Sequence, residues 1–129
     1  MMKYPLEGVR VLGVEQYMSA PYCTMLLADM GAEVIKIERP DGGDPRRFIP
    51  PFATNDKGER VAAGFVAYNR NKKSLALDLR SKAGRQIFEE LAAISDVVGD
   101  NLRPGAMDQL GLGYEDLKKI NPKIVFCTI

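Results

Sequence analysis

The chain has 129 residues, which is enough for one domain of ordinary size and too few for two. Its composition is 46% apolar and 27% charged, as in globular proteins, and the net charge of +1 excludes a global field that would hold nucleic acid or an anionic membrane surface. Because the chain has no histidine, it cannot by itself supply a Ser-His-Asp or Cys-His relay or a His-ligated metal site.

A short β-branched run at residues 9–14 (VRVLGV) predicts a buried parallel strand. Ser19 then fits the N-cap of a helix, and Pro21 fits its first turn, where the missing N–H is not needed. We expect this helix to end at Gly31, and residues 34–38 (VIKIE) predict a second strand that completes a βαβ unit. The apolar positions at helical spacing are Tyr22, Met25, Leu26 and Met30.

Residues 39–60 are rich in Gly, Pro, Asn and Asp turn signals and have no sustained period. They predict a long loop that extends over residues 39–73, and loops of this length in compact domains are usually functional or disordered. A basic stretch of Arg70, Lys72 and Lys73 lies near its end. This stretch could contact a ligand phosphate or form part of a solvated loop, and both interpretations remain open.

Alternating apolar residues at 74–79 (SLALDL) predict a third strand, and Ser81 is expected to cap the helix that follows. The apolar face of that helix is predicted to contain Ile87, Phe88, Leu91 and Ile94. Residues 96–99 predict a fourth short strand, and a turn at residues 101–105 (NLRPG) follows its carboxyl end.

Short helices are expected over residues 106–110 and 114–120, and residues 123–129 (KIVFCTI) predict a fifth strand. This alternation predicts an α/β fold, a Rossmann-like open parallel sheet with helices on both faces. A terminal strand of this composition would lack a covering helix and, at an edge, a partner strand. We therefore expect residues 1–129 to be the amino-terminal part of a longer protein.

The two cysteines, Cys23 and Cys127, form no C-x-x-C pair, and no leader peptide is recognisable before Pro5. No apolar run approaches the roughly 18 residues that a membrane-spanning helix needs. These features predict a cytoplasmic protein. We expect Cys23, Met25 and Met30 to be core or subunit-contact residues, and we expect no metal site.

Ligands of doubly wound sheets bind outside the carboxyl ends of the strands. Arg39, Arg80 and Arg103 follow the second, third and fourth predicted strands. Guanidinium groups pair with phosphate oxygens and stack on adenine, so the three could bind a multiply phosphorylated ligand. Each of them could instead be an ordinary solvated surface residue.

A dinucleotide site is the weaker interpretation. Glu38 ends the second predicted strand, where a Rossmann fold places the carboxylate that binds a ribose. However, residues 13–21 contain no G-x-G-x-x-G, and large side chains there would keep the backbone away from a pyrophosphate. Arg39, next to Glu38, also suits a phosphate better than a free ribose hydroxyl.

Seven motifs follow one another along almost the whole chain. They are PLxGxRVL from Pro5, APxxT from Ala20, LADMGAEVIKIE from Leu27, GDxxR from Gly43, NKKS from Asn71, LDL from Leu77 and NxRPG from Asn101. In this order they resemble the amino-terminal part of the class III CoA-transferase family, which includes formyl-CoA and carnitine CoA-transferases and the related acyl-CoA racemases.

The resemblance implies that coenzyme A or an acyl-CoA binds, as a substrate, at the strand ends. The positions that match the family's CoA contacts are Met18, Ser19, Arg39, Leu77, Asp78, Leu79, Arg80, Asn101, Leu102 and Arg103. One position departs from the family pattern. Gln109 stands where formyl-CoA transferase-like members have a phosphate-binding arginine, and Arg103 could substitute for it.

The resemblance further implies an aspartate nucleophile that forms an aspartyl anhydride and then an aspartyl-CoA thioester, from which CoA passes to a carboxylic acid. No aspartate of this chain matches it, so we assign no catalytic residue here and expect the chain alone to be inactive. An interlocked homodimer is also implied. The alternatives are an α-methylacyl-CoA racemase or acyl-CoA isomerase on the same scaffold, and a nucleotide-binding module without catalysis.

Overall fold

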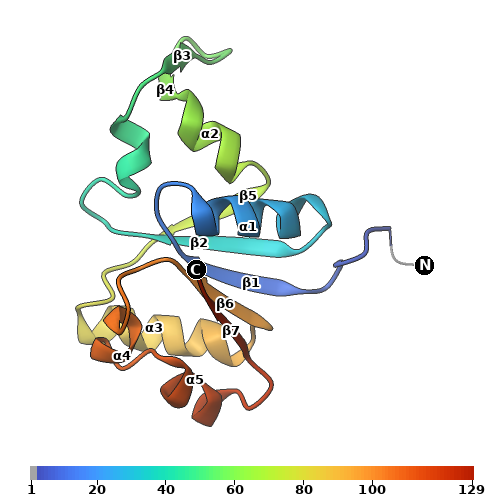
Figure 1. Cartoon of the computed structure of the whole chain (residues 1–129), viewed down its shortest axis with the longest axis vertical. Coiled ribbons are helices and arrows are strands. Elements are labelled where there is room, and N and C mark those ends of the chain that lie inside the picture. Colours follow the sequence, from blue (N-terminus) through green and yellow to red (C-terminus); the bar gives the residue numbers. More distant parts are fainter. Residues whose placement is uncertain (1–2) are drawn as a thin grey trace.

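In a computed structural model, which describes residues 3–129, five parallel strands form one sheet in the order β5-β2-β1-β6-β7 (Figure 1). These strands are β1 (Arg10–Val14), β2 (Glu33–Glu38), β5 (Lys72–Ala76), β6 (Val97–Asp100) and β7 (Val125–Thr128). In the central strand β1, Leu12 lies opposite Ile35 of β2 and Val98 of β6. Because β1 is paired on both edges and covered on both faces, its sequence is almost continuously apolar.

The helices divide between the two faces of this sheet. They are α1 (Ser19–Asp29), α2 (Ala63–Asn69), α3 (Lys82–Ala93), α4 (Ala106–Gln109) and α5 (Tyr114–Ile120). Helices α1 and α2 lie on one side, and α3, α4 and α5 lie on the other (Figure 1). Side chains alternate along a strand, so Val11 packs with Ala28 of α1, whereas Leu12 packs with Phe88 and Leu117 of α3 and α5. The predicted Rossmann-like fold is confirmed.

Two helix starts were predicted from capping residues, and they have different outcomes. Ser81 caps α3 as predicted, because its hydroxyl oxygen accepts a hydrogen bond of 2.9 Å from the Gly84 amide. Ser19 does not cap α1. It is the first helical residue, and Met18 occupies the N-cap without a side-chain bond.

The predicted apolar faces of α1 and α3 are only partly buried. On α1, Met25 is buried, but Tyr22, Leu26 and Met30 are exposed. On α3, Phe88 is buried and Leu91 packs against the core, but Ile87 and Ile94 are exposed. Each helix therefore contacts the sheet along a narrower stripe than its apolar spacing predicts.

Residues 39–73 form short regular elements, so the prediction of a long loop is wrong for most of this segment. It contains the 3₁₀ helix η1 (Pro45–Phe48), the strands β3 (Phe52–Thr54) and β4 (Arg60–Ala62), and α2. The antiparallel hairpin β3–β4 extends away from the main sheet (Figure 1). Elements of 3 to 7 residues are too short to show a helical or strand period in the sequence.

The third strand of the main sheet differs from the predicted 74–79. It begins at Lys72, opposite Val34 of β2, and ends at Ala76. Leu77, just beyond its end, is nevertheless buried. The fifth strand, β7, lies at the sheet edge as expected.

Within residues 3–129, no helix combines the length and the apolarity needed to cross a membrane.

Candidate functional site

A cavity of about 680 Å³ lies at the carboxyl ends of β1, β2, β5 and β6, where the sequence placed the ligand site. Glu15 and Gln16 follow β1, and Arg39 follows β2. Residues 77–80 follow β5, and Leu102 follows β6. Parallel strands all end at the same edge of the sheet, which explains how segments far apart in the sequence enclose one cavity.

Six of the ten positions that match the family's CoA contacts line this cavity. They are Arg39, Leu77, Asp78, Leu79, Arg80 and Leu102. Met18, Ser19, Asn101 and Arg103 lie outside its lining. Arg103 borders a separate depression of about 40 Å³, formed with residues of α4 and β7.

The cavity has a floor that is largely apolar but also includes the buried residues Glu15, Glu38 and Asp44, and it has a charged mouth. The apolar floor side chains come from the strand ends and from α4: Val14, Ile37, Leu77, Leu79, Leu102 and Leu110. Arg39 and Arg80 are exposed at the mouth, where the only acidic neighbour within 4 Å of Arg39 among the described residues is Asp41, 3.6 Å from its Nε. This arrangement suits a ligand with a planar or apolar part and an anionic part.

Two glutamines, Gln109 and Gln16, also line the cavity. Gln109, the position that departs from the family pattern, is exposed and faces the cavity from α4. Gln16 was not among the predicted contacts, although it lies at a strand end where ligands of such sheets bind. The signal that could have identified it is its place two residues beyond the carboxyl end of β1.

Glu38 lines the cavity, but its carboxylate binds other parts of the protein. Arg47 donates to it twice, at 2.8 Å from Nε and 2.7 Å from Nη2, and Ser74 donates at 2.7 Å. The Asp44 amide adds a bond of 2.9 Å. Burial raises the pKa of Glu38, but the hydrogen bonds from Arg47, the Asp44 amide and Ser74 outweigh it and lower the pKa to about 2. These partners occupy the carboxylate that a ribose would need.

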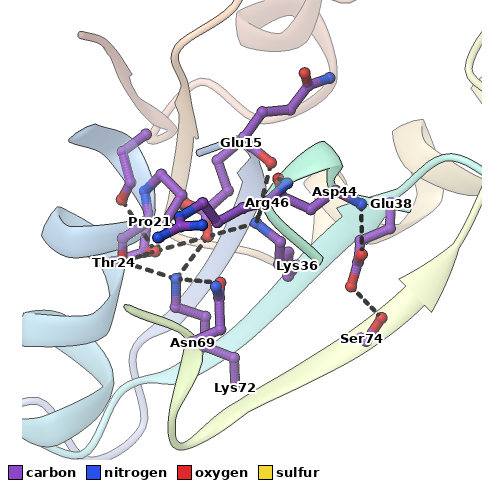
Figure 2. Close-up of polar contacts among 12 residues, drawn as sticks. Glu15, Pro21, Thr24, Lys36, Glu38, Asp44, Arg46, Asn69, Lys72 and Ser74 are labelled. Atoms are coloured by element: carbon purple, nitrogen blue, oxygen red, sulfur yellow. Dashed lines mark hydrogen bonds and ion pairs between the residues drawn. The ribbon is translucent and has the colours of Figure 1, made fainter. Parts of the chain in front are cut away.

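A buried charge network, which consists of Glu15, Lys36, Asp44 and Lys72, adjoins the cavity (Figure 2). Glu15 and Asp44 also line it. Lys36 Nζ is 2.9 Å from Asp44 Oδ2, and Lys72 Nζ is 2.7 Å from Glu15 Oε1. Thr24 also donates to Glu15. Two cations balance two anions, which is the condition under which charged groups can be buried at modest cost.

The three basic side chains at residues 70–73 have different environments. Lys72 is part of the buried charge network, and burial lowers its pKa although Glu15 opposes this shift. Arg70 pairs with Asp29 at 2.6 Å, and Lys73 pairs with Glu33 at 2.5 Å. Lys72 is therefore structural, whereas Arg70 and Lys73 form ion pairs at the solvated surface.

Asn101 follows β6 and binds the backbone of the turn after β1. Its Oδ1 accepts a bond of 2.8 Å from the Gln16 amide, and its Nδ2 donates to the Gln16 carbonyl at 2.7 Å. Nδ2 also lies 3.1 Å from Ser19 Oγ.

In residues 3–129 no group of three or more Cys, Asp or Glu side chains is arranged to hold a metal ion.

The sequence model of the family described as "CoA-transferase family III" matches residues 6–129 of the chain. Among curated proteins, a Mus musculus protein named succinyl-CoA:glutarate CoA-transferase is 47% identical over 126 residues, which cover 97% of this chain and 28% of that protein. A Haloarcula hispanica protein named succinyl-CoA:mesaconate CoA-transferase is 44% identical over 124 residues, covering 96% of this chain and 31% of that protein.

Solved structures give the same result. A CAIB/BAIF family protein from Brucella suis superposes with a TM-score of 0.89 at 42% identity, covering 98% of this chain and 33% of that one. A protein from Mycobacterium tuberculosis superposes with a TM-score of 0.88 at 39% identity, covering 97% and 34%. The chain thus spans about a third of the length of the proteins that it matches.

Proposed function

The chain belongs to CoA-transferase family III, and we propose that it forms the CoA-binding part of an enzyme that moves coenzyme A from a donor acyl-CoA to a carboxylic acid. The observation that supports this most directly is the cavity, because six of the predicted CoA contacts line it. Two relatives are named for the pairs succinyl-CoA with glutarate and succinyl-CoA with mesaconate. We therefore propose a dicarboxylic acid as the acceptor class.

In this proposal the ligand's phosphates lie at the mouth of the cavity, and its adenine or pantetheine part lies on the floor. Arg39 and Arg80 pair with phosphate oxygens, since their guanidinium groups are exposed there. Leu79 and Leu102 contact the apolar part of the ligand. Gln109 supplies a neutral amide at the wall, so the positive charge that binds phosphate comes from other residues.

The chemical step lies outside residues 1–129 in this proposal. By resemblance, an aspartate elsewhere in the protein attacks the donor thioester, which releases CoA thiolate and forms an aspartyl anhydride. The thiolate then attacks the aspartyl carbonyl of the anhydride, which gives the aspartyl-CoA thioester and releases the donor acid, and the present chain holds the CoA part in place during these steps. We also propose that the protein is a cytoplasmic homodimer. The role in holding CoA rests on family membership and on the residues of the cavity, the homodimer rests on the family resemblance, and the cytoplasmic location rests on the cysteine pattern of the sequence.

The test is isothermal titration with CoA, with NAD as the control ligand, using the protein at its full natural length. We expect CoA to bind and each of Arg39→Ala and Arg80→Ala to weaken binding about tenfold, because each removes a charge-assisted phosphate bond. Arg60→Ala is the matched control, since Arg60 stacks on Phe52 in the β3–β4 hairpin. An unchanged dissociation constant in both cavity variants, or a preference for NAD, contradicts the proposal.

An activity assay separates the transferase from the racemase alternative. The protein is mixed with succinyl-CoA and a dicarboxylic acid such as glutarate, and the new acyl-CoA is measured by chromatography. Formation of the new thioester supports CoA transfer. Inversion of an α-methylacyl-CoA without any acceptor acid supports the racemase instead.

A further inference from the structure

The turn between β1 and α1 is held by side chains from other parts of the fold. Four consecutive backbone groups of this turn each bond to such a side chain. The Glu15 carbonyl accepts from Lys36 Nζ at 3.0 Å, and the Tyr17 amide donates to Asp44 Oδ1 at 3.1 Å. Between them, the amide and the carbonyl of Gln16 both bond to the Asn101 side chain. Most turns satisfy these groups through their own backbone or their own side chains.

Tyr17 explains why the turn needs outside support. Its φ is 63°, in the left-handed region that favours glycine and disfavours bulky residues. Such a residue keeps this conformation only where the surrounding structure imposes it. The Asp44 carboxylate accepts a hydrogen bond from the Tyr17 amide itself, and the Asn101 side chain binds the amide and the carbonyl of Gln16, the residue just before this strained position.

These supporting side chains are themselves fixed. Asp44 is buried, pairs with Lys36 at 2.9 Å and accepts a bond from the Arg46 amide (Figure 2). Asn101 uses Oδ1 for the Gln16 amide and both hydrogens of Nδ2 for the Gln16 carbonyl and Ser19 Oγ. An amide side chain has two donors, so Asn101 has none left for a ligand.

We propose that Asn101 and Asp44 are positioning residues, which hold the turn at residues 15–18 so that Gln16 faces the cavity in its ligand-binding conformation. This inference rests on the proposed CoA site, because Gln16 lines that cavity. It changes the role that the family resemblance implied for Asn101. In this proposal the Asn101 side chain acts on the ligand through the Gln16 backbone.

The first test compares Asn101→Ala with wild type at full natural length, by CoA titration and by hydrogen–deuterium exchange of a peptide spanning the turn, without ligand. We expect the variant to bind CoA about tenfold more weakly. Its Gln16 amide should exchange faster because its hydrogen-bond partner is gone, and its Tyr17 amide should exchange faster because the neighbouring residue is no longer held. Asn101→Asp keeps the acceptor for the Gln16 amide but places a carboxylate oxygen against the Gln16 carbonyl, so it should also weaken binding and speed the exchange of the turn.

Asn121→Ala is the matched control. Asn121 also donates to two backbone carbonyls, those of Ala92 and Ser95, but it lies after α5 and not at the cavity. Its removal should lower thermal stability and leave both the dissociation constant and the exchange of the turn unchanged. If this variant weakens CoA binding as much as Asn101→Ala does, the effect is general destabilisation and the proposal is wrong.

A double-mutant cycle separates positioning from direct contact. If Asn101 and Asp44 both act through the turn, Asn101→Ala and Asp44→Asn together should weaken binding by clearly less than the product of their separate factors. Weaker binding by Asn101→Ala without faster exchange of the free turn overturns the proposal, because it indicates a direct ligand contact. Failure of wild type to bind CoA refutes the proposed function, whereas the exchange measurement still tests the turn.

Discussion

Replacing Lys36 with methionine should destabilise the fold severely, because it leaves two buried carboxylates with too little positive charge. Lys36 Nζ lies 2.9 Å from Asp44 Oδ2 and 3.6 Å from Glu15 Oε1, and all three side chains are at most 1% exposed. Methionine has a similar length but no charge, so the packing is largely kept. Breaking a buried ion pair by removing one partner typically costs about 3–5 kcal/mol. Since domains are stable by only about 5–15 kcal/mol, this is a large fraction of the total.

The assay is urea unfolding followed by circular dichroism, with Lys73→Met as the matched control. Lys73 is in the same sheet and also pairs with a carboxylate, that of Glu33, but its side chain is 70% exposed. Surface pairs contribute about 0–1 kcal/mol, so this control should be close to wild type. Combining Lys36→Met with Asp44→Asn should recover part of the loss, because it removes one of the unpaired charges. A loss below about 1 kcal/mol in Lys36→Met alone refutes the argument.

Two other changes test separate parts of the fold. The pKa of Glu38 is about 2 in the folded protein against a usual 4.5, so ionised Glu38 stabilises the fold above about pH 4.5, and this stabilisation is lost as the pH falls from 4.5 towards 2. Glu38→Gln should reduce the pH dependence of the melting temperature over that range, and an unchanged dependence contradicts the assignment. Gly84→Ala, although it favours helix formation in general, should destabilise the protein by about 1–3 kcal/mol, because the new Cβ would overlap the Asp78 carbonyl oxygen. The measurement is thermal unfolding of the variant and of wild type. A higher melting temperature in Gly84→Ala would contradict the prediction.

Local pattern was enough to predict the main layers of the fold. Residues 114–120 form a helix with the predicted bounds, and the five strands of the main sheet all occur within about two or three residues of their predicted ends. Ser81 caps α3 because its hydroxyl needs only an amide three residues away. The cavity was predictable for a related reason: the carboxyl ends of parallel strands must share one edge, wherever the strands occur in the sequence.

Contacts between distant segments decided the roles of individual polar residues. Lys72 appeared to be part of a basic loop, but it is buried in β5 because Glu15, 57 positions away, supplies its counter-charge. Asn101 matched a ligand contact in the sequence, whereas in the structure it binds the Gln16 backbone 85 positions away. A side chain's hydrogen-bond partner depends on which segments the fold brings within about 3 Å, and no local period encodes that. Sequence pattern therefore determined the layers and the edge that holds the cavity, while the tertiary structure decided which charged and amide groups face a ligand and which support the backbone beneath it.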